Sequence, residues 1–194
     1  MCHRLLCYGD SNTYGYDPRS YLGGRYPKTV RWTGLLNTKD WEVINRGENG
    51  RSIPKLSREI DAAVQTVCGT EADILAVMLG SNDLLQYSGS AAQVCGAWMD
   101  RFLRAILAQA QGVPKILLIA PPPMEPGAWV NDPETVEESR KLAGYFEAIA
   151  HQLGVAFADA GAWNVGLAYD GVHFSEEGHL AFARGIQQAL NTLL

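Results

Sequence analysis

The chain has 194 residues, of which 47% are hydrophobic and 19% charged, a composition typical of a globular protein. From this length we expect one domain over residues 1–194. Its 21 acidic and 16 basic residues give a net charge of −5, and an acidic chain without a basic run is a poor match for the phosphate backbone of nucleic acid. The longest apolar runs, 74–79 and 116–120, are too short to span a membrane, so neither nucleic acid nor a membrane is expected as a partner.

The first predicted element is a strand over 5–8, and it follows the first residue too closely to leave room for the apolar region of a signal peptide. We therefore expect a cytoplasmic protein. Further apolar runs predict four more strands, over 42–45, 74–79, 115–120 and 155–159. Because these runs are continuous rather than alternating in polarity, we expect both faces of the sheet to be buried.

Amphipathic stretches between and after these strands predict helices over 53–67, 91–111, 134–152 and 176–194. The alternation of strands and helices predicts an α/β fold, a three-layer sandwich with a five-stranded parallel sheet and helices on both faces. In the flavodoxin-like order 2-1-3-4-5, the segments after strands one and three flank the topological switch point, where such sheets bind ligands.

A serine follows the first strand directly, in the triplet Gly9-Asp10-Ser11. Ser11 suits either a helix N-cap or a nucleophile, and a serine nucleophile needs a base. Among the four histidines, His173 is favoured because Asp170 precedes it by three residues, a spacing that lets the carboxylate orient the imidazole ring. The alternative for this segment is a structural turn at the start of the last helix.

Two further polar segments follow the second and third strands. In Gly80-Ser81-Asn82-Asp83, the amide of Asn82 could donate a hydrogen bond to a developing oxyanion, and an unobstructed backbone N–H at Gly50 is a further candidate donor. Each segment by itself is also an ordinary glycine-containing turn. Since all these segments follow strands of a parallel sheet, we expect them at the same edge.

Three long connections, 11–31, 83–90 and 121–133, also follow the carboxyl ends of strands, and loops of this length are often functional. They carry several aromatic residues, which we predict to line a substrate pocket. The alternative is that these side chains only fasten the loops to the rest of the protein. The candidates are Tyr14, Tyr16, Tyr87 and Trp129.

Taken in order, these motifs resemble the four blocks of the SGNH (GDSL-type) esterases and acylhydrolases. The resemblance implies Ser11 as nucleophile, His173 as general base and Asp170 as the group that orients it. It also implies an oxyanion hole made by the backbone N–H groups of Ser11 and Gly50 and the side chain of Asn82, with Asp10 in a structural role. Where the family name suggests leucine, this chain has Asn12, a difference expected to affect local packing or substrate shape.

A closer likeness is to the arylesterase and acetylesterase branch, carried by the segments 31–34, 120–123 and 158–161. It implies hydrolysis of short-chain esters, such as acetyl or aryl esters and acetylated sugars, through an acyl-enzyme at Ser11. The expected partner is a small-molecule ester, no metal or cofactor is needed, and the long loops are compatible with a homo-oligomer.

Three other functions stay open at this point. One is a lysophospholipase or thioesterase of the same family. Another is a non-catalytic sugar- or acyl-binding module on the same fold. The third is a metal-dependent phosphoesterase, whose oxygen and imidazole ligands would come from Asp10, Asn82, Asp83, Asp170 and His173.

Overall fold

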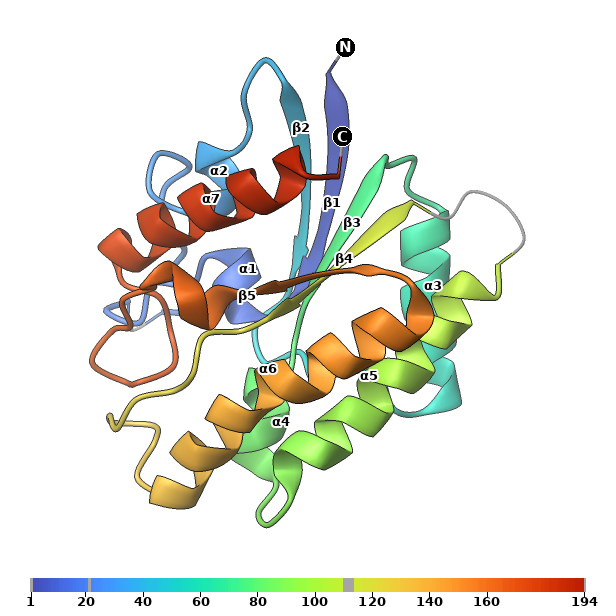
Figure 1. Cartoon of the computed structure of the whole chain (residues 1–194). Helices are drawn as coiled ribbons and strands as arrows, with labels where there is room; N and C mark the ends of the chain where they lie inside the picture. Colours follow the sequence, from blue (N-terminus) through green and yellow to red (C-terminus); the bar gives the residue numbers. More distant parts are fainter. Residues whose placement is uncertain (1, 21, 110–113, 194) are drawn as a thin grey trace.

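A five-stranded parallel sheet forms the centre of the computed structural model, which describes residues 2–20, 22–109 and 114–193 (Figure 1). The strand order is β2-β1-β3-β4-β5, which confirms the predicted fold class and topology. In the register of the sheet, Leu5 of β1 pairs with Val43 of β2 on one side and Ile74 of β3 on the other. The strands are β1 (His3–Gly9), β2 (Trp41–Gly47), β3 (Ile74–Met78), β4 (Lys115–Ala120) and β5 (Ala156–Asp159).

The three central strands bury side chains on both of their faces. In β1, Leu6 and Tyr8 enter one hydrophobic core, and Leu5 and Cys7 enter the other. The same alternation holds in β3 and β4, which explains why these strands are continuous apolar runs in the sequence. The edge strand β5 is only partly buried.

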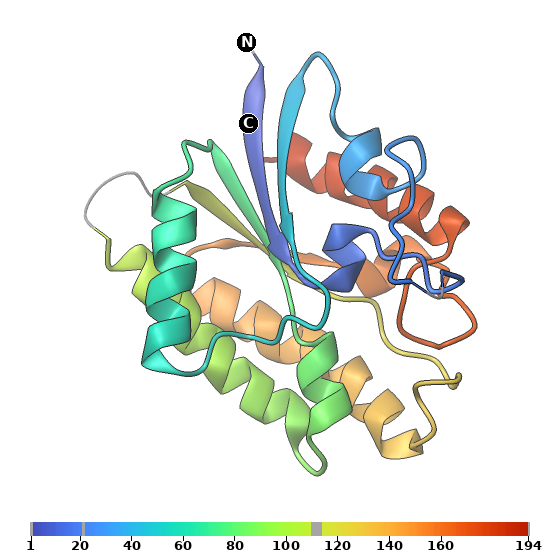
Figure 2. The ribbon, with the colours of Figure 1, turned by 180° about the vertical axis from the view of Figure 1, so that it is seen from behind.

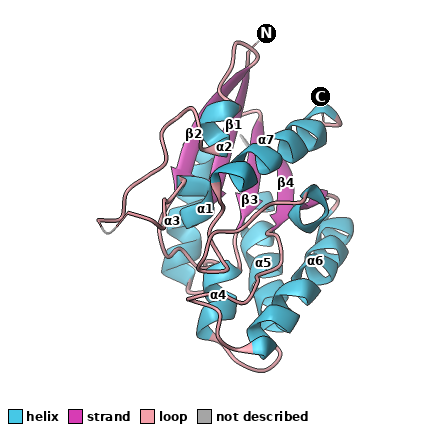
Figure 3. Cartoon of the chain, turned by 90° about the vertical axis from the view of Figure 1, so that its left-hand side faces the viewer, coloured by secondary structure: helices cyan, strands magenta, loops and turns pink. Residues whose placement is uncertain are grey.

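Helices cover both faces of the sheet (Figures 1 and 2). Seen from the side of α2 and α7, the strands lie behind these helices (Figure 3). No helix in the described part of the chain is both long and apolar enough to cross a lipid bilayer. One layer contains α3 (Ser57–Cys68), α4 (Ser81–Gln86), α5 (Ala91–Leu107) and α6 (Pro133–Leu153), and the other contains α1 (Ser11–Tyr14), α2 (Trp32–Leu35), η1 (Ala160–Trp163) and α7 (Glu176–Asn191).

The long helices agree with the prediction except at their ends. Helix α3 begins at Ser57 rather than at residue 53, because Pro54 disfavours a helical conformation in the residue before it. Glu59 then accepts hydrogen bonds from the backbone N–H groups of Lys55 and Leu56 and so satisfies the start of the helix. Helix α5 already ends at Leu107, and the predicted helix ends at 111 and 194 lie outside the described residues.

The short helices α1, α2, α4 and η1 were not predicted. Helix α1 occupies the first four residues of the segment 11–31, and α4 occupies the first half of the segment 83–90, both of which were expected to be loops. Both begin immediately after a strand, at the carboxyl edge of the sheet. As a result, Ser11 and Asn82 lie on helices rather than in flexible connections.

Candidate active site

Ser11 is the first residue of α1, directly beyond the end of β1. Asp10, not Ser11, is the N-cap of this helix, and its buried carboxylate accepts a hydrogen bond from the backbone N–H of Asn12 at 3.0 Å. Burial raises the pKa of Asp10 to about 6. Glycine is required at position 9, because a Cβ there would lie 2.1 Å from Oγ1 of Thr13. This tight turn fixes Ser11 at the edge of the sheet.

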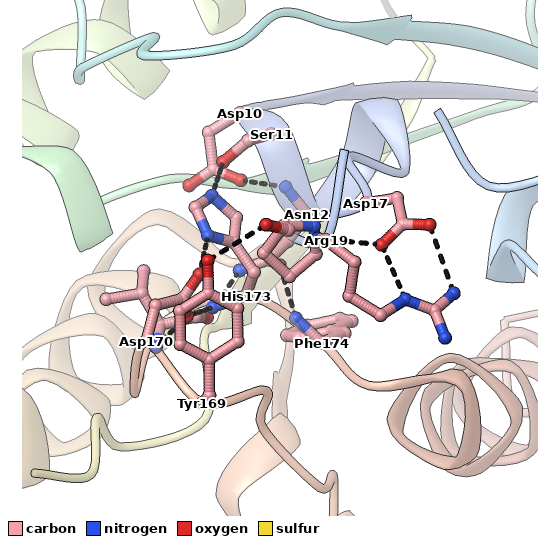
Figure 4. A network of polar contacts seen from close by, with 11 residues as sticks. Asp10, Ser11, Asn12, Asp17, Arg19, Tyr169, Asp170, His173 and Phe174 are labelled. Carbon is pink, nitrogen blue, oxygen red and sulfur yellow. Dashed lines mark hydrogen bonds and ion pairs between the residues drawn. The ribbon is translucent and has the colours of Figure 1, made fainter. Parts of the chain in front are cut away.

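His173 lies in the segment before α7, and its ring lies next to the side chain of Ser11 (Figure 4). Nε2 of His173 lies 3.0 Å from Oγ of Ser11, and Nδ1 lies 2.7 Å from Oδ2 of Asp170. Because an ionised carboxylate only accepts hydrogen bonds, Nδ1 carries the proton of the neutral ring, and Nε2 accepts from the serine hydroxyl. The structure thus brings the three predicted residues into one hydrogen-bonded chain.

Asp170 organises the turn that carries His173. Its Oδ1 accepts from the backbone N–H groups of Val172 and His173, both at 2.9 Å. Burial by itself would raise the pKa of Asp170, but the hydrogen bonds from His173 and from these backbone groups favour the charged form and hold the pKa below its usual range. Gly171 has a φ of +80°, and a Cβ there would lie 2.0 Å from the carbonyl oxygen of Glu125, so only glycine fits.

The other two predicted donors lie on the segment after β2 and on α4. Nδ2 of Asn82 donates to the carbonyl oxygen of Arg51 at 3.0 Å, and Asp83 accepts from the backbone N–H of Ile53 at 2.9 Å. Two neighbouring residues of α4 therefore hold the segment that follows Gly50. Gly50 has a φ of +76°, and apart from Gly50 and its two chain neighbours none of the described atoms lies within 4 Å of where its Cβ would be, so the space around it is open.

Arg51 connects this segment to the end of β1. Its Nη1 donates to the carbonyl oxygen of Gly9 at 2.8 Å and also to that of Arg46. The guanidinium lies 4.3 Å from the centre of the Tyr8 ring. Next to it, a cavity of about 560 Å³ opens between this segment and α3, and Gly50 is one of its lining residues.

Two of the four predicted pocket residues contact His173. The ring centroid of Tyr16 lies 4.6 Å from that of His173, and the centroid of Trp129 lies 4.9 Å from it. Trp129 is 51% exposed, so part of its surface is available to a ligand. Its backbone N–H donates to the carbonyl oxygen of Asp170 at 3.1 Å, which attaches the loop of Trp129 to the turn of His173.

The other two predicted pocket residues make different contacts. Tyr14 lies beside the guanidinium of Arg25, which is 4.4 Å from the centre of its ring. Tyr87 packs edge-on against Trp98, with ring centroids 5.0 Å apart, and Nζ of Lys55 lies 4.9 Å from the centre of the Tyr87 ring.

Sequence reasoning missed the contacts of Asn12. Its side chain reaches the backbone of Val172 and Phe174, the two neighbours of His173 in the sequence. In the sequence, the only signal for these contacts is the position of Asn12 beside Ser11, which predicts an effect on packing or substrate shape but no particular partner.

The residues proposed for a metal-dependent phosphoesterase have other partners in the structure. Asp10 binds the backbone of α1, and Asp170 binds His173 and its turn. Within the described ranges, no group of three or more His, Cys, Asp or Glu side chains is arranged to hold a metal ion. What the arrangement offers instead is a hydroxyl beside an imidazole that a carboxylate orients, which suits proton transfer from a nucleophile.

This chain is similar to one protein family and to solved structures of esterases. The model of the GDSL-like lipase/acylhydrolase family matches residues 7–181. An aryl esterase from M. smegmatis of known structure shares 26% sequence identity with this chain, and the two structures superpose with a TM-score of 0.84 over 100% of both chains. Est24, a carbohydrate acetylesterase from Sinorhizobium meliloti, is 26% identical, with a TM-score of 0.83 over 99% of this chain and 100% of the other. No curated protein matches the sequence.

Proposed function

Since the chain belongs to the GDSL-like lipase/acylhydrolase family, we propose that it is a carboxylic ester hydrolase that forms an acyl-enzyme at Ser11. One observation carries this proposal: Nε2 of His173 lies 3.0 Å from Oγ of Ser11, in a ring whose Nδ1 is hydrogen-bonded to Asp170. The esterase names of two similar structures agree with this class of reaction.

The proposed reaction has two steps. His173 accepts the hydroxyl proton of Ser11 as Oγ attacks the ester carbonyl, and Asp170 stabilises the imidazolium that forms. His173 then donates the proton to the departing alcohol. A water molecule then gives a proton to the same imidazole as it attacks the acyl-enzyme, and the imidazole returns this proton to Oγ of Ser11 as the bond to the acyl group breaks and the acid is released. This sequence of steps uses no metal ion and no cofactor.

The negative charge on the tetrahedral intermediate would be stabilised by three donors, the backbone N–H groups of Ser11 and Gly50 and the side-chain amide of Asn82. An amide nitrogen has two hydrogens. In Asn82, one of them binds the carbonyl oxygen of Arg51 and fixes the orientation of the side chain, so the second is available to the substrate.

We propose short acyl or aryl esters, acetylated sugars included, as substrates. The names of the aryl esterase and of the carbohydrate acetylesterase support this class. Tyr14, Tyr16, Tyr87 and Trp129 stay candidates for the pocket, and the contacts with His173 favour Tyr16 and Trp129 most directly. A cytoplasmic location, the lack of nucleic-acid and membrane partners and the formation of a homo-oligomer stay predictions from the sequence.

A chain-length series of p-nitrophenyl esters tests the proposal. We expect kcat/KM to be highest for acetate or propionate, and Ser11→Ala to lower kcat by about 10⁴-fold or more. A fluorophosphonate should add to Ser11 in the wild type. Ser90→Ala, which changes an exposed serine before α5, is the matched control and should keep full activity. Activity that survives in Ser11→Ala would exclude the acyl-enzyme at this residue.

A further inference from the structure

We propose that Asn12 is a positioning residue that sets the distance between Ser11 and His173, an inference that rests on the proposed function. Asn12 is 3% exposed and lies next to Ser11 on α1. Its Nδ2 donates to the carbonyl oxygen of Val172 at 3.1 Å, and its Oδ1 accepts from the N–H of Phe174 at 2.9 Å (Figure 4). One side chain thus binds the backbone on both sides of His173.

Asn12 is itself held firmly. Its backbone N–H donates to the carboxylate of Asp10 at 3.0 Å, and its carbonyl oxygen accepts from Nε1 of Trp32 at 2.9 Å. Trp32 is 1% exposed and packs on Phe182 of α7. The side-chain amide of Asn12 therefore extends from a backbone that is held in place. Its hydrogen bonds can fix the position of the turn of His173 relative to α1.

The two side-chain hydrogen bonds of Asn12 connect different segments from those of Asp170. Asp170 binds His173 within a single turn, three residues away in the sequence. Asn12 instead joins this turn to α1, 160 residues away from Val172 and 162 from Phe174. Loss of Asn12 would leave the Asp170–His173 pair intact and would loosen the contact between Ser11 and His173. A displacement of about 1 Å between reacting groups can cost about 10²-fold in rate.

Leucine at this position could form neither bond. Val172 and Phe174 are both buried, so the carbonyl oxygen of one and the N–H of the other would lose their partner without access to water. The name GDSL suggests leucine at this position, and this chain has asparagine. The hydrogen bonds that join α1 to the turn of His173 explain this difference, which is therefore not only a matter of packing or substrate shape.

The test compares Asn12→Leu with Thr13→Val. Thr13 is the next residue of α1, is 1% exposed, and its Oγ1 has no hydrogen-bond partner among the described residues, so the control removes a buried polar atom without breaking a bond. With a short-chain p-nitrophenyl ester we expect Asn12→Leu to lower kcat by about 10²-fold and to change KM by less than about threefold. The rate of fluorophosphonate inactivation should fall in parallel.

Proton NMR supplies a signal that distinguishes positioning from general damage. The proton on Nδ1 of His173, shared with Asp170 at 2.7 Å, should give a low-field resonance in the wild type, in Thr13→Val and in Asn12→Leu. Should Asn12→Leu fail to fold, Asn12→Ala replaces it, because the smaller side chain leaves space for water to bind the two backbone groups.

Several results would overturn the proposal: an unchanged kcat in a folded Asn12 variant, an equal loss in Thr13→Val, or disappearance of the low-field resonance together with the activity. These results differ from a failure of the proposed function. A wild type that neither hydrolyses esters nor reacts with the fluorophosphonate overturns both proposals, whereas a reactive wild type with fully active Asn12 variants overturns this one alone.

Discussion

Trp129 lies edge-on against the ring of His173, with ring centroids 4.9 Å apart and an interplanar angle of 82°. The loop that carries it is hydrogen-bonded to the turn of His173, since the N–H of Ala128 donates to Tyr169 and the N–H of Trp129 donates to Asp170, both at 3.1 Å. Gly127 permits this approach, because a Cβ there would lie 2.4 Å from the backbone of Asp170. The proposed base and one wall of the proposed pocket therefore lie on two segments that are hydrogen-bonded to each other.

Replacing this wall should change substrate preference. We expect Trp129→Ala to lower kcat/KM for an aryl ester about tenfold more than for an alkyl ester of the same acid, because an aromatic leaving group would lose its flat contact surface. The measurement is kcat/KM for matched phenyl and alkyl acetates. Tyr145→Ala, an exposed aromatic residue of α6, serves as the control. Equal losses for both esters would remove Trp129 from the aryl site.

Asp170→Asn tests the orientation of the imidazole. The side-chain oxygen of asparagine can still accept from the backbone N–H groups of Val172 and His173, so the turn should keep its conformation. The amide N–H₂ would face Nδ1 of His173 and favour the wrong tautomer, and we expect kcat to fall by about 10³- to 10⁴-fold. Steady-state kinetics and the thermal midpoint would be measured together.

The control for this variant is Asp159→Asn, which changes an aspartate that also binds a backbone N–H two residues away, that of Gly161 at 2.8 Å. It should leave kcat unchanged. A loss of less than tenfold in Asp170→Asn, with an unaltered thermal midpoint, would contradict the proposed role of the carboxylate.

The proposed oxyanion donors should differ in their response to mutation. Asn82→Ala removes a side-chain donor, and we expect kcat to fall by about 10²- to 10³-fold with little change in KM. Gly50→Ala keeps the backbone N–H and meets open space, but its φ of +76° is unfavourable for alanine, at about 1 kcal/mol of stability. Its kcat should therefore fall much less. A reversed order of the two losses would exclude Asn82 as the principal side-chain donor.

Asp83 should make stability depend on pH. Its carboxylate is fully buried, and Nζ of Lys55 lies 3.7 Å from Oδ1, too far for a hydrogen bond. Burial raises the pKa of Asp83 to about 6. Between the unfolded pKa, near 4, and pH 6, the folded state binds more protons than the unfolded state, so this residue's contribution to the free energy of unfolding falls as the pH rises.

Asp83→Asn removes this contribution. Relative to the wild type, the variant should gain about 2 kcal/mol in the free energy of unfolding between pH 4 and pH 7. Urea unfolding of both proteins at several pH values measures the difference, in which the titration of groups that do not interact with Asp83 cancels. A difference that stays constant over this range would show that Asp83 does not titrate as its burial implies.

The long helices could be predicted because each contains enough residues to display its periodicity, and the strands because they lie in short apolar runs between these helices. The short helices could not. Helix α2 has four residues and is held by tertiary contacts, such as the packing of Trp32 on Phe182, which lies far away in the sequence. In the same way, Asp10 rather than Ser11 caps α1, a choice that depends on how β1 ends.

Within the site, the spacing of Asp170 and His173 was informative because both residues lie in one turn. The aromatic candidates were harder to separate. Tyr16 and Trp129 contact His173, whereas Tyr14 lies against Arg25. Which ring faces the histidine depends on the paths of long loops, and those paths are set by hydrogen bonds between distant segments. The contacts of Asn12 belong to the same class and have no local signature.

Ser11 and His173 touch although 162 positions separate them in the chain. During synthesis, the hydroxyl leaves the ribosome on the order of 10 s before the imidazole that we propose as its base, at usual elongation rates. An unfinished chain that ends before residue 170 would contain all five described strands of the sheet, but its Ser11 would lack the imidazole of His173. Under the proposed mechanism, docking of the turn of His173 is thus the event that makes Ser11 reactive, and a fluorophosphonate would report in real time when this turn has docked in newly made molecules.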